Sequence, residues 1–526
     1  MMEKRSKQLR LQMAHAVLWC IGFLLFAFPA TAASPGSGIG INLNGIADWH
    51  PNLPFANVFK QARPWHPVPQ DSKLDLDEKG WIKSLKPGQK AGSYVMSSGN
   101  YPEGDYLFTY DGRGKVELGG DPMKVVGRNE NGTLFHITPK KFVAVDIIET
   151  DPKDPVRNVR LYLPSVAKKK GGFPTFNPEY VQYLRGFNVI RFMSLASTNN
   201  SKIKEWQDRV LPSDAPNGYE RGVAYESMVE LTNSLDADPW FTIPHLATDN
   251  FVKHFAQFLK ENVKKDKKIY IEYSNEVWNS MFSQNNYAIR METKASQGAD
   301  EKSEAGIIEK IQNRLFAKSE PKEKINGDRF YARRSIEIFK IFENVFGGAG
   351  RLVRVISGHA PNRYRARKLL EYPGLADHAD AYAIAPYIGH DTRRSTIEAG
   401  PDAILDQLEN ELVGYQQMVR ANQAMAEHFG LKLIAYEAGQ HLTGVDSKNV
   451  PICAAPNRSP RMKNIYQRYL NIWAEETGNS LMVLFADMDR ASHSGCWGLS
   501  ESYQDKDPPK LEAVKEFMRA NGQLGK

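Results

Sequence analysis

Two glutamates stand at the ends of apolar runs in this sequence. Glu276 lies in Tyr-Ser-Asn-Glu-Val-Trp-Asn after the run 268–273, and Glu437 lies in Ala-Tyr-Glu-Ala-Gly-Gln-His after the run 432–436. Two carboxyl groups that face each other across a cleft can divide acid–base chemistry, because one holds a proton while the other stays ionised. The alternative, that each is a lone structural carboxylate, stays open.

Elements far apart in the sequence must bring these two glutamates together. Stretches with helical spacing, such as 177–185, 225–235, 250–264 and 328–346, separate a series of short apolar runs. The eight runs are 39–44, 188–193, 240–244, 268–273, 352–356, 381–385, 432–436 and 481–485. This alternation predicts an α/β fold, a TIM (β/α)8 barrel, whose chemistry lies at the C-terminal ends of the strands. Glu276 would then follow the fourth strand and Glu437 the seventh, at the barrel mouth.

Residues 70–165 differ from the rest of the sequence in their pattern of apolar and polar residues. Short runs of alternating apolar and polar residues, such as 104–110 and 142–148, are separated by turns rich in Gly, Asp and Asn. This pattern predicts a small antiparallel β-sandwich, inserted after the first barrel strand. We therefore expect a first barrel strand and mouth loop at 33–69, the sandwich at 70–165 and the rest of the barrel at 166–526.

The N-terminal segment has the features of an export signal. Lys4, Arg5, Lys7 and Arg10 precede the apolar run 16–28, and Ala30-Thr31-Ala32 is a small-x-small cleavage site. Residues 1–32 are thus predicted to be a secretory signal peptide, which would direct the protein to the periplasm or outside the cell. An uncleaved membrane anchor is the alternative, and after cleavage we expect no membrane span.

Much of the formal net charge of +7 belongs to this segment, which holds four basic residues against the single acid Glu3. The basic runs that remain, 168–170 and 264–268, have no interleaved aromatic residues. We therefore expect no nucleic-acid partner. A composition of 41% hydrophobic and 25% charged residues also excludes a disordered chain.

The sequence contains 3 cysteines, of which Cys20 lies in the predicted signal. Cys453 and Cys496 follow the seventh and eighth strands, and an exported protein is predicted to join such a pair in a disulfide. Two unpaired thiols are the alternative. His390, His441 and His493 lie near the mouth, but no HExxH motif, helically spaced His pair or Cys ligand set accompanies them. We expect no metal and no other cofactor.

Paired carboxylates at the mouth of a barrel are suited to glycoside hydrolysis. Asn275-Glu276 on the fourth strand and Tyr436-Glu437 on the seventh resemble the clan A glycoside hydrolases, which are retaining enzymes on TIM barrels. The resemblance covers about 174–520 and 38–69. Val277 stands where the clan usually has proline, and the motifs do not assign a specific family within the clan.

This resemblance implies a double displacement on a β-linked oligo- or polysaccharide. Glu437 would be the nucleophile and Glu276 the acid/base. Glu276 must then keep its proton at the working pH while Glu437 stays ionised. A non-catalytic saccharide-binding protein, a transglycosylase and an inverting enzyme are the alternatives, and the sandwich could bind sugar or only support the barrel.

Other residues at strand ends are candidates for substrate binding. By resemblance, Arg191 would hold Glu437 ionised, Asn275 would bind the sugar 2-hydroxyl, and Tyr387 would donate to the nucleophile. Trp497 would form a floor for the sugar ring. By position, His245 and His359 are candidate hydroxyl ligands, and Trp49 and Trp278 offer aromatic faces to a sugar. Rim salt bridges and packed core aromatics remain the alternatives for this set.

Overall fold

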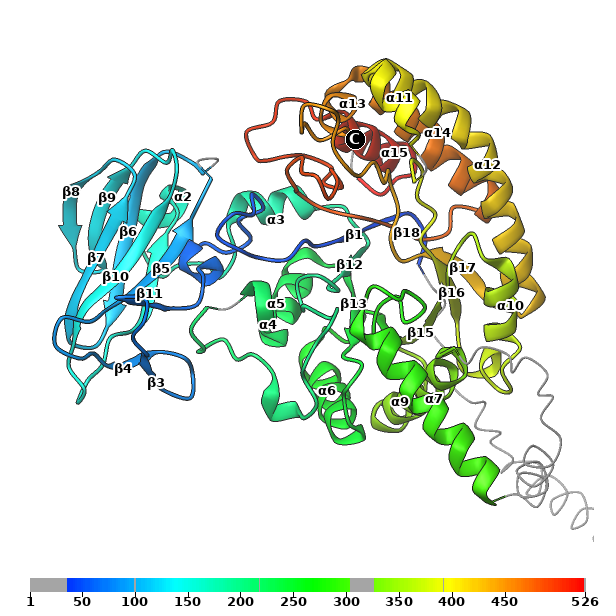
Figure 1. The fold of residues 1–526 in the computed structure, drawn as a ribbon, viewed down its shortest axis with the longest axis horizontal. Helices are drawn as coiled ribbons and strands as arrows, with labels where there is room; N and C mark the ends of the chain where they lie inside the picture. Colours follow the sequence, from blue (N-terminus) through cyan, green and yellow to red (C-terminus); the bar gives the residue numbers. More distant parts are fainter. Residues whose placement is uncertain (1–35, 99–100, 217, 303–325, 391, 525–526) are drawn as a thin grey trace, which may run out of the picture.

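The computed structural model describes residues 36–98, 101–216, 218–302, 326–390 and 392–524. Eight parallel strands close into a barrel in chain order (Figure 1). The strands are β1 (Ile39–Asn42), β12 (Val189–Arg191), β13 (Asp238–Ile243), β14 (Ile269–Tyr273), β15 (Leu352–Ser357), β16 (Ala381–Ile384), β17 (Lys432–Ala435) and β18 (Met482–Leu484). The expected TIM barrel is confirmed, and the predicted signal peptide 1–32 lies outside the described residues.

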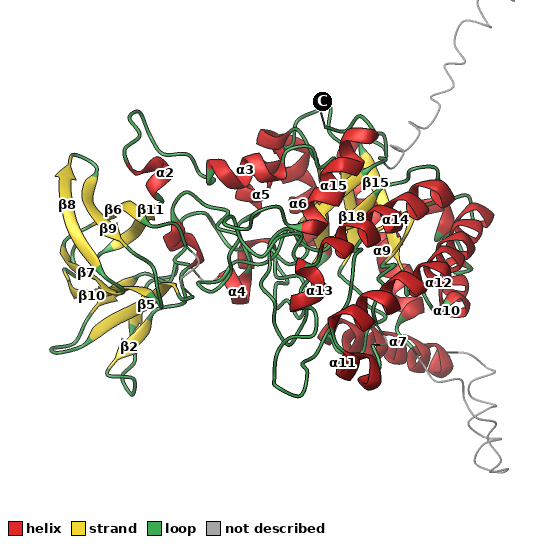
Figure 2. Ribbon diagram, turned by 90° about the horizontal axis from the view of Figure 1, so that it is seen from above, coloured by secondary structure: helices red, strands yellow, loops and turns green. Residues whose placement is uncertain are grey.

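Helices surround the barrel strands on the outside (Figure 2). The main ones are α3 (Pro178–Leu184), α5 (Tyr225–Leu235), α6 (Asp249–Asn262), α7 (Ser283–Lys302), α9 (Asp328–Phe346), α10 (Arg363–Leu370), α12 (Pro401–His428), α14 (Pro460–Thr477) and α15 (Pro509–Ala520). Helix α6 illustrates the local cause, because the Thr248 side chain caps its first turn and Phe251, Phe255 and Leu259 are buried along one face.

The barrel interior is packed with side chains. Trp240, Tyr270, Val353 and Ile434 belong to a core cluster formed by the strands. Residues at alternate positions, such as Ile271, instead belong to the larger core that includes the surrounding helices. A ligand therefore has access only at the ends of the strands.

Two antiparallel sheets lie between β1 and β12 in the sequence and beside the barrel in space (Figure 1). One sheet contains β2 (His66–Val68), β5 (Lys90–Met96), β10 (Val143–Thr150) and β7 (Gly114–Gly120), in that order. The other contains β11 (Arg157–Tyr162), β6 (Gly104–Asp111), β9 (Gly132–Ile137) and β8 (Met123–Asn129). A two-stranded pair, β3 (Asp75–Leu76) and β4 (Ile82–Ser84), accompanies them.

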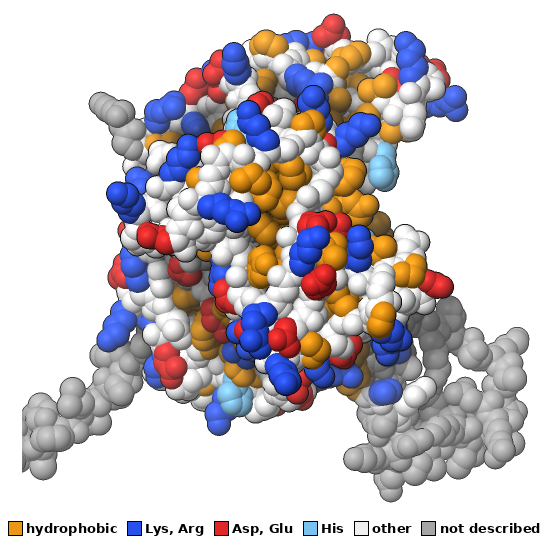
Figure 3. Space-filling view, turned by 90° about the vertical axis from the view of Figure 1, so that its left-hand side faces the viewer, with side chains coloured by type: hydrophobic (Ala, Val, Ile, Leu, Met, Phe, Trp, Pro, Cys, Tyr) orange, Lys and Arg blue, Asp and Glu red, His pale blue; other side chains and the backbone are white. Residues whose placement is uncertain are grey.

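The two larger sheets share one apolar core, to which Ala91 and Val145 contribute from one sheet and Tyr106 and Leu161 from the other. Strand β2 pairs with β5 and begins at His66, within the range 33–69 that we expected to be barrel strand and mouth loop. Figure 3 views the molecule from this side and shows hydrophobic side chains across the middle of the face, bordered by charged ones.

The loop after β1 joins these sheets to the barrel mouth. Asp48 in this loop is completely buried and accepts a hydrogen bond from Arg63 Nε at 2.7 Å. Its carbonyl accepts from the Ser97 backbone N–H at 2.8 Å. A further link runs from Trp81 Nε1 to the carbonyl of Ser213 at 3.0 Å. Partly buried polar contacts thus join the sandwich to the segments beside the mouth.

Cys453 and Cys496 form a disulfide, with 5.8 Å between their Cα atoms, so this expectation is confirmed. The carbonyl of Cys496 also accepts from Gln440 Nε2 at 2.6 Å, Lys510 Nζ at 2.7 Å and Asn457 Nδ2 at 2.9 Å. These contacts anchor the loop that carries Trp497. In the ranges given above, no helix is both long enough and apolar enough to cross a membrane.

Removing the disulfide should destabilise the protein. The bond joins residues separated by 43 positions, and a cross-link over a loop of this size typically contributes about 2–4 kcal/mol. We expect the double variant Cys453→Ser/Cys496→Ser to lose a free energy of unfolding in this range in urea titrations. Wild-type protein treated with dithiothreitol should lose the same amount, whereas an unchanged midpoint after reduction would contradict the prediction.

Candidate active site

Glu276 follows β14 in a turn with unusual backbone geometry. Ser274 and Glu276 have positive φ angles of 59° and 42°, a region that costs energy for residues other than glycine. The Glu276 carboxyl accepts from Tyr436 Oη at 2.9 Å and from Asn279 Nδ2 at 2.8 Å. Both partners are neutral donors, and among the described residues this carboxyl has no direct ion pair.

Glu437 follows β17 and is only 6% exposed. One carboxyl oxygen accepts from Arg191 Nη1 at 3.0 Å, and the other accepts from Tyr387 Oη at 3.0 Å. Tyr387 follows β16 and Arg191 ends β12, so three strand ends meet at this carboxyl. Unlike Glu276, Glu437 has a cation as a direct partner.

Arg191 is fully buried and uses all five of its N–H donors. Nη1 donates to Glu437 and to Asn42 Oδ1 at 3.0 Å. Nη2 donates to Glu272 at 2.8 Å and to Asn275 Oδ1 at 2.8 Å, and Nε donates to Glu272 at 3.2 Å. One guanidinium therefore links the ends of β1, β12, β14 and β17.

Two aromatic rings complete the environment of this guanidinium. Its central carbon lies 5.3 Å from the ring centre of Trp240 and 5.1 Å from that of Tyr436. Such cation–π contacts are favourable for a desolvated arginine. Burial alone would lower the pKa of Arg191, but the negative charges of Glu272 and Glu437 hold it above the usual value. The site therefore contains one permanent positive charge.

Glu272 is a third carboxylate that we did not predict from the sequence. It lies within β14, is completely buried, and accepts from Trp240 Nε1 at 3.0 Å in addition to Arg191. Its other oxygen, Oε1, has no hydrogen-bond partner among the described residues. The available signal was an acidic residue inside an otherwise apolar strand, where an unpaired charge would be very costly.

The electrostatics favour a shared proton on the two mouth carboxyls. Burial raises the pKa of Glu276, while its bonds to Asn279 and Tyr436 oppose the rise. Burial also raises the pKa of Glu437, Arg191 lowers it, and the charge of Glu276 raises it again. The two groups therefore titrate as a coupled pair. When the pair carries one negative charge, the bonds from Arg191 and Tyr387 stabilise it best on Glu437.

Aromatic side chains extend from Tyr387 along one side of the site. The ring centre of His441 lies 5.2 Å from that of Tyr387 and 4.2 Å from that of His390. Trp497 contacts the same histidine, because its Nε1 donates to His441 Nδ1 at 3.2 Å. His441 and Tyr387 therefore connect Trp497 to Glu437. This role of His441 was not predicted from the sequence.

A second aromatic pair lies beside the Glu276 turn. Trp278 and His359 stack with ring centres 4.3 Å apart, and Arg365 Nη1 donates to the Trp278 carbonyl at 3.1 Å. The two predicted residues are thus brought together from the segments that follow β14 and β15.

The other predicted residues are distributed around the rim. Asn275 is buried, and its amide donates to Asn199 Oδ1 at 3.1 Å. His245 is also buried, packs against Tyr287, and has no hydrogen-bond partner for Nδ1 in the described part of the chain. Trp49 instead contacts Arg63 and His50 at the junction with the antiparallel sheets.

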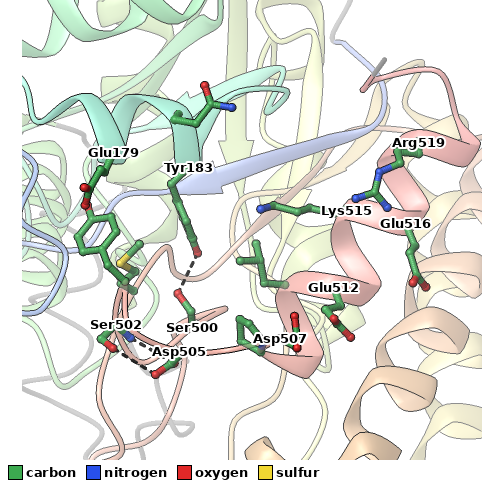
Figure 4. A pocket seen from close by; sticks show the side chains of 15 residues that line it. Glu179, Tyr183, Ser500, Ser502, Asp505, Asp507, Glu512, Lys515, Glu516 and Arg519 are labelled. Atoms are coloured by element: carbon green, nitrogen blue, oxygen red, sulfur yellow. Dashed lines mark hydrogen bonds between the residues drawn. The ribbon is translucent and has the colours of Figure 1, made fainter. Parts of the chain in front are cut away.

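A separate hollow of about 470 Å³ lies between α3, α15 and the loop after β18 (Figure 4). Tyr183 donates to the Asp487 carbonyl at 2.8 Å beside it, and neither mouth carboxyl lines it.

In the described ranges, no group of three or more His, Cys, Asp or Glu side chains is placed to hold a metal ion.

Comparisons with known proteins found no matching family model and no matching curated protein. Solved structures similar to this chain include the GH51 arabinofuranosidase from Xanthomonas axonopodis pv. citri, with 9% identity over 66% of this chain and 67% of that one and a TM-score of 0.41. A psychrophilic family 10 endo-β-1,4-xylanase has 12% identity over 64% and 92%, with a TM-score of 0.36. The endo-β-1,4-mannanase from Thermotoga petrophila has 11% identity over 64% and 72%, with a TM-score of 0.32.

Replacing Glu272 should change the titration of Glu276 without direct contact. The negative charge of Glu272 raises the pKa of Glu276, so Glu272→Gln should lower that pKa while the amide oxygen still accepts from Arg191. Carbon-13 NMR titration of glutamate-labelled protein would measure the change. Glu343→Gln, which removes a carboxylate from the different arginine Arg354, is the matched control. An unchanged or raised pKa of Glu276 in Glu272→Gln would contradict the electrostatic role.

Proposed function

We propose that this protein is an exported, retaining glycoside hydrolase of clan A that acts on a β-linked oligo- or polysaccharide. The observation that carries the proposal is the pair of unequal carboxyls at the ends of β14 and β17: in the described part of the chain, Glu437 is bonded to a cation and Glu276 to neutral donors. A retaining glycosidase needs this inequality, because one carboxyl donates a proton while the other attacks.

In the first step, a Glu437 oxygen attacks the anomeric carbon of the sugar. The bond from that carbon to the leaving oxygen breaks, and Glu276 gives its proton to the leaving oxygen. The products are the shortened saccharide and a glycosyl ester on Glu437. Arg191 and Tyr387 position the nucleophile, since each bonds to one of its oxygens.

The second step reverses these roles. The ester no longer carries the negative charge of Glu437, so Glu276 ionises more readily and accepts a proton from water. The resulting hydroxyl attacks the anomeric carbon, the ester bond breaks, and Glu437 leaves as a carboxylate. The sugar then has the same anomeric configuration as at the start.

The sugar-binding roles follow from the surroundings of the two carboxyls. Asn275 lies next to Arg191 and is the proposed partner of the 2-hydroxyl. Trp497 and the stacked pair of Trp278 and His359 offer aromatic surface on two sides of the site. His245 has a polar atom without a partner in the described residues and is the proposed ligand of another hydroxyl. Trp49, at the junction, would contact only a longer chain.

Export and domain roles are part of the same proposal. The sequence of residues 1–32 supports a signal peptide, and a disulfide supports an oxidising compartment. The proposed units are the barrel strand and loop at 33–69, of which His66–Val68 pairs with the sandwich, the sandwich at 70–165 and the remaining barrel at 166–526. Buried contacts of Asp48 at their junction favour a supporting role for the sandwich.

Purified protein should release reducing sugar from at least one member of a panel of β-linked polysaccharides. Glu437→Gln should abolish turnover, and Glu276→Gln should lower it by about 10²–10⁴-fold, because each removes one of the two catalytic groups. Glu398→Gln, on the exposed face of α11 (Arg394–Ala399), is the control that should keep full activity. A fully active Glu437→Gln protein would refute the mechanism.

Azide should distinguish the two carboxyls in simple alanine variants. With an activated glycoside that needs no acid, Glu276→Ala should still form the ester, and azide should then accelerate turnover by releasing a glycosyl azide of retained configuration. The same anion added to Glu437→Ala should instead give a product of inverted configuration, because azide replaces the missing nucleophile. Exchanged outcomes would mean that the roles of the two glutamates are reversed.

A further inference from the structure

His441 is held by Trp497 in a way that determines where its proton lies. An indole N–H can only donate a hydrogen bond, so His441 Nδ1 must accept at the 3.2 Å contact with Trp497 Nε1. A neutral imidazole whose Nδ1 accepts carries its proton on Nε2. The geometry of this one contact therefore defines the tautomer.

Because Nδ1 bonds to Trp497, Nε2 is the ring nitrogen of His441 that remains for another partner. Within the described residues His441 Nε2 makes no hydrogen bond, and it is not among the buried atoms that lack one, so solvent reaches it. The imidazole also packs against the ring of Tyr387, whose hydroxyl donates to Glu437. An N–H donor thus lies against the ring of Tyr387, one side chain away from the proposed nucleophile.

We propose that His441 is a substrate-binding residue that donates its Nε2 proton to a hydroxyl oxygen of the sugar attached to Glu437, an inference that rests on the proposed function. This contact would determine specificity for the sugar that is attached to Glu437. Trp497 has a second role here, since it fixes the tautomer of the histidine as well as offering a ring to the sugar.

The surroundings also define the chemical class of the partner. Burial and the neighbouring His390 lower the pKa of His441 to about 4, so the imidazole stays neutral at ordinary pH. A neutral N–H suits an uncharged hydroxyl, whereas a uronate or sulfate group would require a cation there. A metal ion is also excluded as the partner of this tautomer, because Nδ1 is occupied and Nε2 carries a proton.

Nitrogen-15 NMR of histidine-labelled protein tests the tautomer directly. The expected result for His441 is an unprotonated Nδ1 and a protonated Nε2 from pH 5 to pH 9, with assignment by comparison with His441→Gln. In Trp497→Phe the ring remains aromatic but the donor is lost, so the tautomers should mix. A proton on Nδ1 in the wild type, or an imidazolium at pH 6, would overturn the inference.

A thermodynamic cycle of binding measurements tests whether His441 bonds to a sugar hydroxyl. The probes are the smallest saccharide product released by the wild type and its monodeoxy derivatives, and the measurement is calorimetry on Glu276→Gln protein with and without His441→Phe. Removing one particular hydroxyl from the saccharide should lower its affinity about ten-fold when His441 is present. The same removal should leave the affinity for His441→Phe protein unchanged, as expected for a single hydrogen bond. If each monodeoxy saccharide lost the same affinity for both proteins, the proposed contact would be overturned.

The two experiments separate this inference from the proposed function. If the protein binds saccharide but does not hydrolyse it, the same cycle can be run with oligosaccharides taken from the polysaccharide panel. The proposed function then fails, while the result of the cycle still decides the role of His441. Tighter binding of a uronate-containing oligosaccharide than of its neutral counterpart would contradict the neutral donor.

Discussion

A fully buried guanidinium is the constraint on which this site depends. Arg191 cannot lose its charge, so its burial is tolerable only if carboxylates and acceptors take up every donor. Glu272 and Glu437 supply the charge, and Asn42 and Asn275 take the remaining N–H groups. Because Arg191 and these partners belong to four different strands or strand ends, closing the barrel and assembling the site are one event. The same network presents a cation to Glu437, which opposes the rise in the pKa of this carboxyl that burial causes.

Glu276, the second carboxyl, differs from Glu437 in its hydrogen-bond partners. Glu276 lies in a strained turn, where its carboxyl accepts from the neutral donors Tyr436 and Asn279 and forms no ion pair with a residue in the described ranges. Tyr436 contacts both halves of the network, because its ring lies against Arg191 and its hydroxyl bonds to Glu276. The disulfide and the buried Lys510 act farther out, where they hold the loop that brings Trp497 to His441.

Much of this arrangement could be read from the sequence, because apolar runs and the residues that follow them are local features. The barrel, the positions of Glu276, Glu437, Arg191 and Tyr387 at strand ends, and the disulfide were accessible in this way. The contacts of Glu272 and of the Tyr436 hydroxyl are not accessible in this way, because the pattern of a buried strand does not distinguish them from side chains that only pack. Strand β2 was missed because Pro67 in a three-residue edge strand resembles a loop. The bond between Trp497 and His441 joins two loops, which no local pattern predicts.

The stereochemistry of a single turnover tests the central claim most directly. Proton NMR of wild-type protein with an activated β-glycoside of the sugar it cleaves would show the first-formed anomer before mutarotation. The account predicts the β-anomer, because attack by Glu437 and then by water inverts the anomeric carbon twice. Appearance of the α-anomer first would contradict it, since the two carboxyls would then activate water in a single displacement.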